Sequence, residues 1–326
     1  MLRKIATSAL VSVLWKCFAL LTVFILVPPP IVAKECGNVS GSDTPTKTIR
    51  RTAPLIPGSN LIVTNPVGSI QLSGWEREQI IVEARIEGEK PDSVEIDFKK
   101  VNAGIEVVIK NISTRRLLGL MPPKKVKCDL IISVPRQILI RVKAINGQIK
   151  ISDINGSTKC ETVNGGIQML NIFGDIDAST VNGSISLSKA NLRPRIVIRR
   201  PPGQPPPPPP HTATIKLETV NGTIQMDEVV GGIVANTIHG AIRANMLFGL
   251  GKDINLESIS GNLTIENLHG RSQVTAESIV GVIEIKTPNS QVKKETKTSV
   301  VATIPGTPNQ LQKISLKTVN GKITVQ

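Results

Sequence analysis

Hydrophobic and polar residues alternate through most of the chain, in short runs that each follow a glycine. Ile149 and Ile151 follow Gly147 in this way, and the same arrangement recurs after Gly183 and Gly222. A period of two puts one face of a strand in a core and the other face in solvent. The pattern predicts a chain built from many short strands, with Ile, Val and Leu inside.

These runs belong to an internal repeat of about 18 to 21 residues. Glycine recurs every nine residues from Gly147 to Gly183, and again from Gly222 to Gly240. On every second glycine the motif is strongest, because Thr or Ser stands three residues earlier, at Thr162, Thr180, Thr219, Thr237, Ser258, Ser278 and Thr318. Each repeat therefore predicts two strands and two turns.

Such repeats favour a coil that winds back onto itself, because like residues recur in the same column of each successive coil. In the segment ETVNG we expect Thr162 in a stacked column, Val163 in the core, and Asn164-Gly165 as a turn in which glycine adopts a positive φ. We predict an all-β fold, a single-stranded β-solenoid of the right-handed β-helix type. The repeats give it about 18 to 21 residues per coil.

Two segments carry a resemblance to a known family. Cys128 to Met169, CDLIISVPRQILIRVKAINGQIKISDINGSTKCETVNGGIQM, is followed by further Val-Asn-Gly-x-Ile units. Asn60 to Gly88, NLIVTNPVGSIQLSGWEREQIIVEARIEG, adds a Gly-x-Ile strand and a turn at Trp75. Together they resemble a bacterial putative-adhesin family of unknown function with β-strand repeats. The resemblance covers nearly all of the mature chain, and it implies an exported β-solenoid with no established activity.

The first residues have the pattern of a signal peptide. Basic residues up to Lys16 precede an apolar run that ends at Val27, and small residues lead to Ala33. We expect a signal peptide at 1–33, cleaved after Ala33. The chain would then be exported to the periplasm, the cell surface or the medium. A signal anchor and a lipoprotein at Cys36 are the alternatives.

After the leader we expect a linker at 34–59, a β segment at 60–135 that caps or begins the solenoid, and repeats at 136–326. Two insertions interrupt the repeats, at 189–214 and at 287–313. The first holds the proline run PPGQPPPPPP, which cannot join a sheet and predicts an extended arm. The second predicts a polar loop. Each adds about one coil's length of chain, so the choice between loop and extra coil stays open.

Cleavage would leave three cysteines, Cys36, Cys128 and Cys160, which cannot all pair within one chain. Cys128 alternates in phase with Leu130, and Cys160 occupies a column filled elsewhere by Ile or Ala. We expect both to be buried small hydrophobes. A disulfide between Cys128 and Cys160 is the alternative if their strands are neighbours.

No residue pattern points to a metal or a cofactor, and we expect none. The glycine doublets lack the further Gly and Asp of calcium-binding β-rolls, nucleotide-binding glycine loops do not occur, and the histidines do not cluster with cysteines.

Catalysis by paired carboxylates would need acids gathered on one face of the coil. Only Asp175 and Asp177 share a strand face among the candidates Asp153, Asp175, Asp177, Asp227 and Asp253. Aromatic residues, which sugar-cleaving sites use as platforms, make up 2% of the chain. We therefore expect no catalytic residues and no enzyme activity.

Charge is the clearest indication of a partner. The formal charge of +14 falls to +11 when Arg3, Lys4 and Lys16 are removed with the leader. We expect an anionic envelope polymer, glycan or lipid headgroup to bind the arginines before the proline run, Arg193, Arg195, Arg199 and Arg200. Export and the scarcity of aromatic residues disfavour nucleic acid. We expect no small-molecule substrate, and the oligomeric state stays open.

The sequence thus predicts a non-enzymatic, exported β-solenoid that serves as a structural, adhesin-like or binding surface at the bacterial cell envelope. A carbohydrate-active β-helix enzyme and an accessory component of an envelope-stress response are the alternatives.

Overall fold

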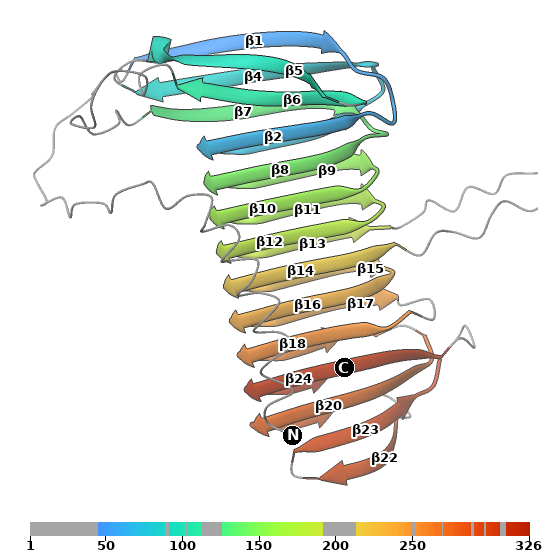
Figure 1. The fold of residues 1–326 in the computed structure, drawn as a ribbon. Helices are drawn as coiled ribbons and strands as arrows, with labels where there is room; N and C mark the ends of the chain where they lie inside the picture. Colours follow the sequence, from blue (N-terminus) through green and yellow to red (C-terminus); the bar gives the residue numbers. More distant parts are fainter. Residues whose placement is uncertain are drawn as a thin grey trace, which may run out of the picture.

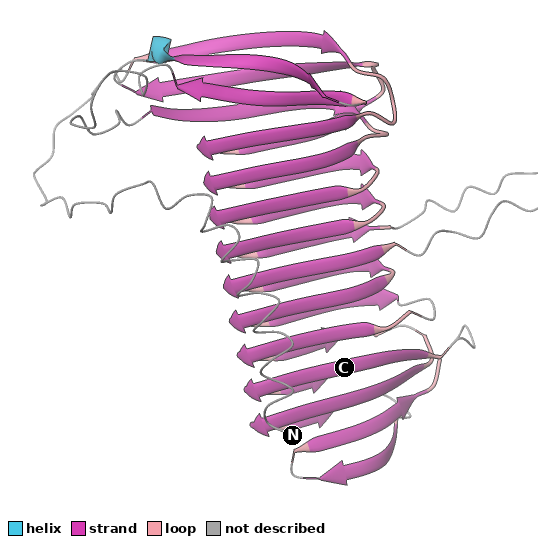
Figure 2. Cartoon of the chain, viewed as in Figure 1, coloured by secondary structure: helices cyan, strands magenta, loops and turns pink. Residues whose placement is uncertain are grey.

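The computed structural model describes residues 45–88, 91–101, 103–111, 126–191, 213–248, 252–268, 270–287, 290–296, 298–306 and 311–326. These residues form an all-β fold of two long sheets, with one short 3-10 turn, η1 (Pro91–Ser93). Figure 1 shows the two sheets as layers that run along one long axis, and Figure 2 shows strands throughout. The predicted all-β class is confirmed, whereas the predicted leader lies outside the described residues.

Sheet A contains twelve strands. In spatial order they are β1 (Thr46–Pro54), β4 (Gln79–Gly88), β7 (Val126–Pro135), β3 (Ile70–Trp75), β9 (Ile149–Asn155), β11 (Ile167–Phe173), β13 (Ile185–Ala190), β15 (Ile224–Val230), β17 (Ile242–Phe248), β19 (Leu263–Glu266), β25 (Ile323–Val325) and β21 (Ile283–Ile285).

Sheet B contains thirteen strands. In spatial order they are β22 (Gln291–Thr296), β23 (Ser299–Ile304), β20 (Ser272–Val280), β24 (Gln312–Asn320), β18 (Ile254–Ser260), β16 (Gly232–His239), β14 (Thr214–Asn221), β12 (Ile176–Asn182), β10 (Thr158–Asn164), β8 (Leu139–Asn146), β2 (Asn60–Val67), β6 (Gly104–Asn111) and β5 (Val94–Val101).

Through the repeats, consecutive strands alternate between the sheets, and we call such a pair, one strand from each sheet, a rung. β10 and β11 form one rung, and β12 and β13 form the next. β10 pairs with β12 in parallel, with Cys160 opposite Ala178, so the register equals the 18-residue repeat. Ala178 in turn lies opposite Leu217 of β14, so the insertion at 189–214 leaves the register unchanged.

The core lies between the two sheets and is made of aligned aliphatic columns. One column lies in sheet A, where a fully buried residue stands two positions after the turn glycine. Its members are Ile149, Ile167, Ile185, Ile224, Ile242, Leu263 and Ile323. Close contact between such columns excludes water along the stack, and this burial is the main stabilising contribution among the described residues.

The threonine column is inside the core, and the valine beside it is outside, which corrects the expectation for ETVNG. Thr162 is fully buried, whereas Val163 is half-exposed on the outer face of β10. The buried hydroxyl is satisfied because it donates to the carbonyl oxygen of the turn glycine in the adjacent rung. Thr180 donates to Gly165 at 2.9 Å in this way. The hydroxyl therefore ties each strand to the neighbouring turn.

Gly165 and Gly183 are required in their turns by close stacking rather than by a left-handed backbone. A Cβ on Gly165 would lie 2.0 Å from the carbonyl oxygen of Gly147, and a Cβ on Gly183 would lie equally close to that of Gly165. Neither glycine has a positive φ. The expected role of glycine in these turns is therefore wrong in its cause, although the turn itself is present.

At each end of the stack one rung lies out of sequence order. The rung β2/β3 lies between β6/β7 and β8/β9, because β2 pairs in parallel with β6 and β8 while β3 pairs with β7 and β9. The C-terminal rung β24/β25 likewise lies between β18/β19 and β20/β21. The first and the last rungs in the sequence are therefore interior strands of both sheets.

Antiparallel strands close the ends of the stack. β5 pairs with β6, and β4 and β1 extend sheet A beyond β7. β23 and β22 extend sheet B beyond β20. The segment 34–59 thus contains strand β1 instead of linker alone, because Ile49 and Ala53 pack against the core. The second insertion contains the hairpin β22–β23 instead of a polar loop, because Val300 and Ala302 alternate into the core face.

Both described cysteines are buried and free. Cys128 lies on β7 in sheet A and Cys160 on β10 in sheet B, so their strands are not neighbours. Burial raises the pKa of the Cys128 thiol to about 12. Both behave as the small hydrophobes that the alternation predicts.

Candidate functional site

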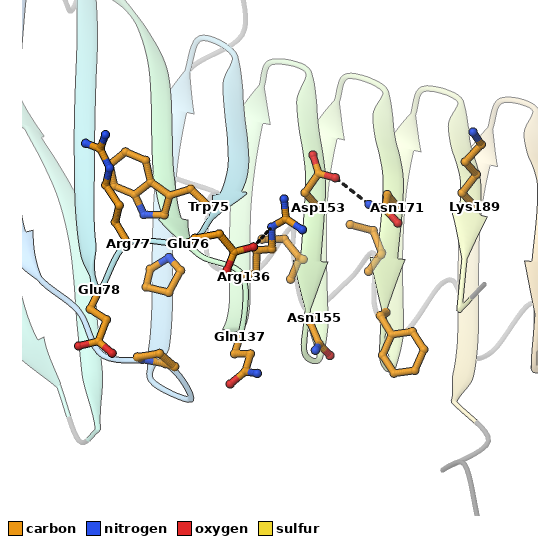
Figure 3. A pocket seen from close by; sticks show the side chains of 15 residues that line it. Trp75, Glu76, Arg77, Glu78, Arg136, Gln137, Asp153, Asn155, Asn171 and Lys189 are labelled. Carbon is orange, nitrogen blue, oxygen red and sulfur yellow. Dashed lines mark hydrogen bonds and ion pairs between the residues drawn. The ribbon is translucent and has the colours of Figure 1, made fainter. Parts of the chain in front are cut away.

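A groove of about 680 Å³ opens at the corner where the sheet A strands end, near the N-terminal end of the stack. Its lining comes from the turn between β3 and β4, the turn between β7 and β8, and the ends of β9 and β11 (Figure 3). The groove forms where two strands separate. β3 pairs with β9 only as far as Ser73 opposite Ser152, but it continues along β7 to Trp75.

Trp75 is held in a fixed orientation at one side of the groove. Its indole N–H donates to the carbonyl oxygen of Gln79 at 3.0 Å. The guanidinium of Arg77 lies 5.3 Å from the ring centroid, within the range of a cation–π interaction. Phe173, at the end of β11, supplies a second aromatic ring in the lining. Figure 3 shows Trp75 on the β3 side of the groove and Asn171 on the β11 side.

The backbone at this corner is left-handed at one residue in each of three neighbouring strands. Asp153, Asn171 and Lys189 have φ values of 59°, 55° and 55°. This conformation shifts the alternation by one position, so that Asn171 is exposed while Ile172 returns to the core. Asn and Asp tolerate it best among residues with a side chain. The bend therefore places Asp153, Asn171 and Lys189 in the groove lining.

The charged groups in the lining are balanced and partly paired. Nε of Arg136 lies 3.1 Å from Oε1 of Glu76. The amide of Asn171 donates to Oδ1 of Asp153 at 2.7 Å. With Arg77, Lys189 and Glu78 the lining holds three cations and three anions. Such a surface presents many hydrogen-bonding groups around two aromatic rings and carries no net charge.

The predicted site residues are only partly described. Arg193, Arg195, Arg199 and Arg200 lie outside the described residues, so their contacts stay a prediction. Among the described residues no three His, Cys, Asp or Glu side chains are grouped as metal ligands. Nor does this part of the chain contain a helix with the length and apolarity that a membrane crossing requires.

Four of the five acids weighed as catalytic candidates take part in side-chain contacts between rungs. Asp175 accepts a hydrogen bond from the backbone N–H of Thr214 at 2.8 Å. Asp177 pairs with Lys159 at 2.7 Å. Asp227 accepts from the amide of Asn245 at 2.7 Å, as Asp153 does from Asn171. Each of these acids thus links neighbouring strands of the stack.

An ion-pair chain crosses the outer face of sheet B. Lys143 lies 3.0 Å from Glu161, and Lys159 lies 3.3 Å from Glu161 and 2.7 Å from Asp177. Burial acts to raise the pKa of Glu161, but Lys143 and Lys159 together hold it below its usual range. The hydrogen bond to Asp177 chiefly raises the pKa of Lys159. The chain joins β8, β10 and β12.

Sequence reasoning identified the turn at Trp75 but did not assign it to a site. The groove residues come from positions far apart in the sequence, and the out-of-order rung β2/β3 brings them together. A signal was present, because Trp75 and Phe173 both stand at strand ends in a chain with two Trp and five Phe. Rare aromatic residues at turns, where no core needs them, indicate a binding surface.

Comparison with protein-family models finds no match, and comparison with curated proteins finds none either. Solved structures do show similarity. A putative adhesin from Bacteroides fragilis is 15% identical, with a TM-score of 0.35, over 86% of this chain and 97% of that one. A putative cell adhesion protein from Clostridium sporogenes is 12% identical, with a TM-score of 0.26, over 86% and 99%. A putative adhesin from Parabacteroides merdae is 12% identical, with a TM-score of 0.27, over 86% and 96%. Likeness at this level carries no argument about function.

Proposed function

We propose that this chain is an exported β-solenoid of the right-handed β-helix type, and that it acts without catalysis as an adhesin-like binding surface at the bacterial cell envelope. The groove beside Trp75 is its binding site, and the ligand is a short stretch of a neutral glycan. The observation that carries the proposal is the presence of Trp75 and Phe173 in one groove whose charged groups balance.

The chemistry of the lining favours a sugar. Aromatic faces take the apolar C–H surface of a pyranose ring, and fixed amide and charged groups bind its hydroxyls. Asn171, Asn155 and Gln137 supply amides, while Arg136 and Glu76 supply a donor and an acceptor at one side. The balanced charge disfavours a strongly anionic ligand here. Contact with an anionic polymer at Arg193, Arg195, Arg199 and Arg200 is a separate part of the proposal.

The absence of catalysis is supported by the surroundings of the groove acids. Glu76 has a side chain that is 81% exposed and is paired with Arg136, and Asp153 is hydrogen-bonded to Asn171. A general acid in a glycosidase is normally kept protonated by an apolar or like-charged environment. Neither acid has that environment.

Binding of a panel of neutral and uronic-acid oligosaccharides to the purified chain tests the proposal, first on an array and then by calorimetry. We expect neutral oligosaccharides to bind, with a loss on the order of tenfold or more in Trp75→Ala and Phe173→Ala. Val282→Ala is the control, since Val282 is 58% exposed at the other end of the stack.

Unchanged binding in both aromatic variants would exclude the groove as the site. Release of new reducing ends by the chain, abolished in Asp153→Asn, would support the carbohydrate-active enzyme instead. Binding restricted to uronic-acid oligosaccharides would move the site to the basic residues.

A further inference from the structure

The outer face of sheet B carries an unbroken column of aliphatic side chains. On each strand one Val or Ile stands between a buried residue, Thr or Ser on every strand but β8, and the exposed turn residue, and it points outward. In spatial order the members of this aliphatic stripe are Ile145, Val163, Val181, Val220, Ile238, Ile259, Val319 and Ile279. They are partly exposed, and Ile279 reaches 38%. The stripe therefore follows the long axis over eight strands.

Strand propensity alone does not account for this stripe. Propensity favours Thr as well as Val and Ile at an exposed strand position. No Thr occurs in these eight positions, and no charged residue occurs there either. The next outward column on the same strands is polar throughout. A continuous apolar band beside a polar column on the outer face of a sheet indicates an interface.

The polar column beside the stripe identifies the partner as a second copy of the chain. In spatial order this polar row reads Lys143, Glu161, Ser179, Glu218, Asn236, Glu257, Lys317 and Glu277, of which Glu218 and Asn236 are buried within the chain. A twofold axis parallel to the strands would lay stripe on stripe and reverse the order of the row. Lys143 would then face Glu277 of the partner copy, and Glu161 would face Lys317. Ser179 would face Glu257, while Glu218 and Asn236, nearest the axis, are buried within each copy, so no like charges of the accessible positions would meet.

The charges also select this register over its neighbours. A shift by one strand in one direction places Lys143 against Lys317 and Glu161 against Glu257. A shift in the other direction places Glu161 against Glu277. Like charges directly opposite each other are destabilising, so the unshifted arrangement is favoured. Each ion pair within one copy, Lys143–Glu161 or Lys317–Glu277, then faces an ion pair of reversed order.

The area is sufficient for a stable dimer. The face spans eight strands at about 4.8 Å spacing, which gives about 34 Å along the stack. The aliphatic stripe, the polar row and the next outward column beside the row give it a width of roughly 17 Å along the strands. That face buries roughly 1,200 Å² in total, which lies within the range of specific interfaces. The strands from β8 to β18 run nearly parallel in Figure 1, so two such faces can lie flat against each other.

We propose that two copies of this chain associate through the aliphatic stripe of sheet B, in an antiparallel, twofold arrangement set by the polar row. The groove lies at the corner where the sheet A strands end, so the dimer leaves both grooves open. Two grooves on one rigid body would bind a polymer with higher avidity than one. The dimer itself stands independently of the ligand proposed for the groove.

Sedimentation equilibrium of the chain purified after export tests the dimer. We expect a monomer–dimer equilibrium at micromolar concentrations. Val220→Lys should weaken dimerisation at least about tenfold, because Val220 lies next to the twofold axis and each copy would bury a lysine against the other. The matched control is Leu170→Lys, an aliphatic residue that is 49% exposed on the outer face of sheet A, and it should leave the dimer unchanged.

Exchanging the two charges of one expected ion pair between the copies tests the register. The exchange also distinguishes a lost contact between the copies from a folding defect. Lys317→Glu should weaken the dimer by placing two acids opposite each other, and the double variant Glu161→Lys, Lys317→Glu should restore it. Circular dichroism of each variant monitors the fold. A chain that stays monomeric at all concentrations would overturn the proposal, as would a dimer indifferent to Val220→Lys. A dimer weakened by Val220→Lys but not rescued in the double variant would overturn the antiparallel register.

Discussion

Each rung has two corners, and they are built differently. The Asn–Gly corner leads from a sheet B strand to a sheet A strand, and the opposite corner leads back to sheet B. At the Asn–Gly corner, the turn glycines stack on one another from rung to rung, and the rungs from β8 to β14 also share a ladder of asparagine side chains. The amide of Asn164 donates to Asn146 at 2.8 Å, and the amide of Asn182 donates to Asn164 at 2.9 Å. At the opposite corner, the residues differ from rung to rung, and Asp153, Asn171 and Lys189 occupy the equivalent place.

The Asn–Gly corner therefore serves as scaffold, whereas the opposite corner carries the candidate site. The Asn–Gly corner has to repeat, because each glycine contacts the backbone of the glycine in the adjacent rung and each Thr hydroxyl binds the adjacent turn. At the opposite corner the left-handed residue is Asp153, Asn171 or Lys189, and its contacts differ from rung to rung, since Asn171 binds Asp153 whereas Lys189 is exposed. The groove therefore forms at the corner where the repeat is least strict.

The largest expected effect comes from adding one methyl group at the Asn–Gly corner. Gly183→Ala places a Cβ 2.0 Å from a backbone oxygen. We expect a loss of about 3 kcal/mol in the free energy of unfolding, because neither rung can move without disturbing the next. Urea unfolding followed by circular dichroism measures it. Gly232→Ala is the control, since the nearest atom there lies 3.5 Å away. Equal midpoints for the two variants would show that the corner tolerates side chains.

A smaller loss is expected when the hydroxyl of the buried column is removed. Thr180→Val keeps the shape of the side chain but leaves the carbonyl of Gly165 without its 2.9 Å donor. We expect about 1 kcal/mol of destabilisation. Thermal unfolding compares this variant with Thr180→Ser, which retains the hydroxyl. Greater stability of the valine variant would mean that packing, not the hydrogen bond, governs the column.

The stability of the fold should also depend on pH, through the carboxyl of Asp129 where β7 contacts the turn before β3. Asp129 of β7 accepts from the backbone N–H and the hydroxyl of Ser69, each at 2.7 Å, and pairs with Lys127 at 2.6 Å. Burial acts to raise the pKa of Asp129, but these partners together hold it below its usual range. A carboxyl with a depressed pKa stabilises the fold at neutral pH, and the contribution is lost as the pH falls through the folded-state pKa.

Melting temperatures from pH 7 downward measure this contribution. We expect Asp129→Asn to lower the melting temperature at neutral pH and to differ less from the native chain below about pH 3.8. A constant difference across the range would show that Asp129 acts through its geometry and not its charge.

The smallest effect is expected at the variable corner. Lys189 has a left-handed backbone, which costs a residue without a short polar side chain some conformational energy. Lys189→Asn should therefore stabilise the fold by about 0.5 kcal/mol. Differential scanning calorimetry resolves such a shift, with Lys150→Asn on the outer face of β9 as the control. Destabilisation in Lys189→Asn alone would show that the lysine makes a contact worth more than the backbone strain.

The strands and their register were predictable because Ile149, Ile167 and Ile185 recur at fixed spacing and all face the core. The place of Thr162 was not, since a threonine in the core depends on a carbonyl from another rung that the local pattern does not reveal. The groove was not predictable either. It depends on β3 leaving β9 after Ser73, which follows from the position of β2/β3 between two later rungs.

Those interior first and last rungs have a consequence for how the molecule comes apart. A stack of repeats normally frays from its chain ends, one unit at a time. Here the terminal rung β24/β25 has a neighbour on both sides, and so does β2/β3. Neither can detach without breaking two ladders in each sheet, and neither can dock until the rungs that flank it exist. The described strands are therefore expected to unfold as one cooperative unit. During folding, β2/β3 and β24/β25 are expected to dock last.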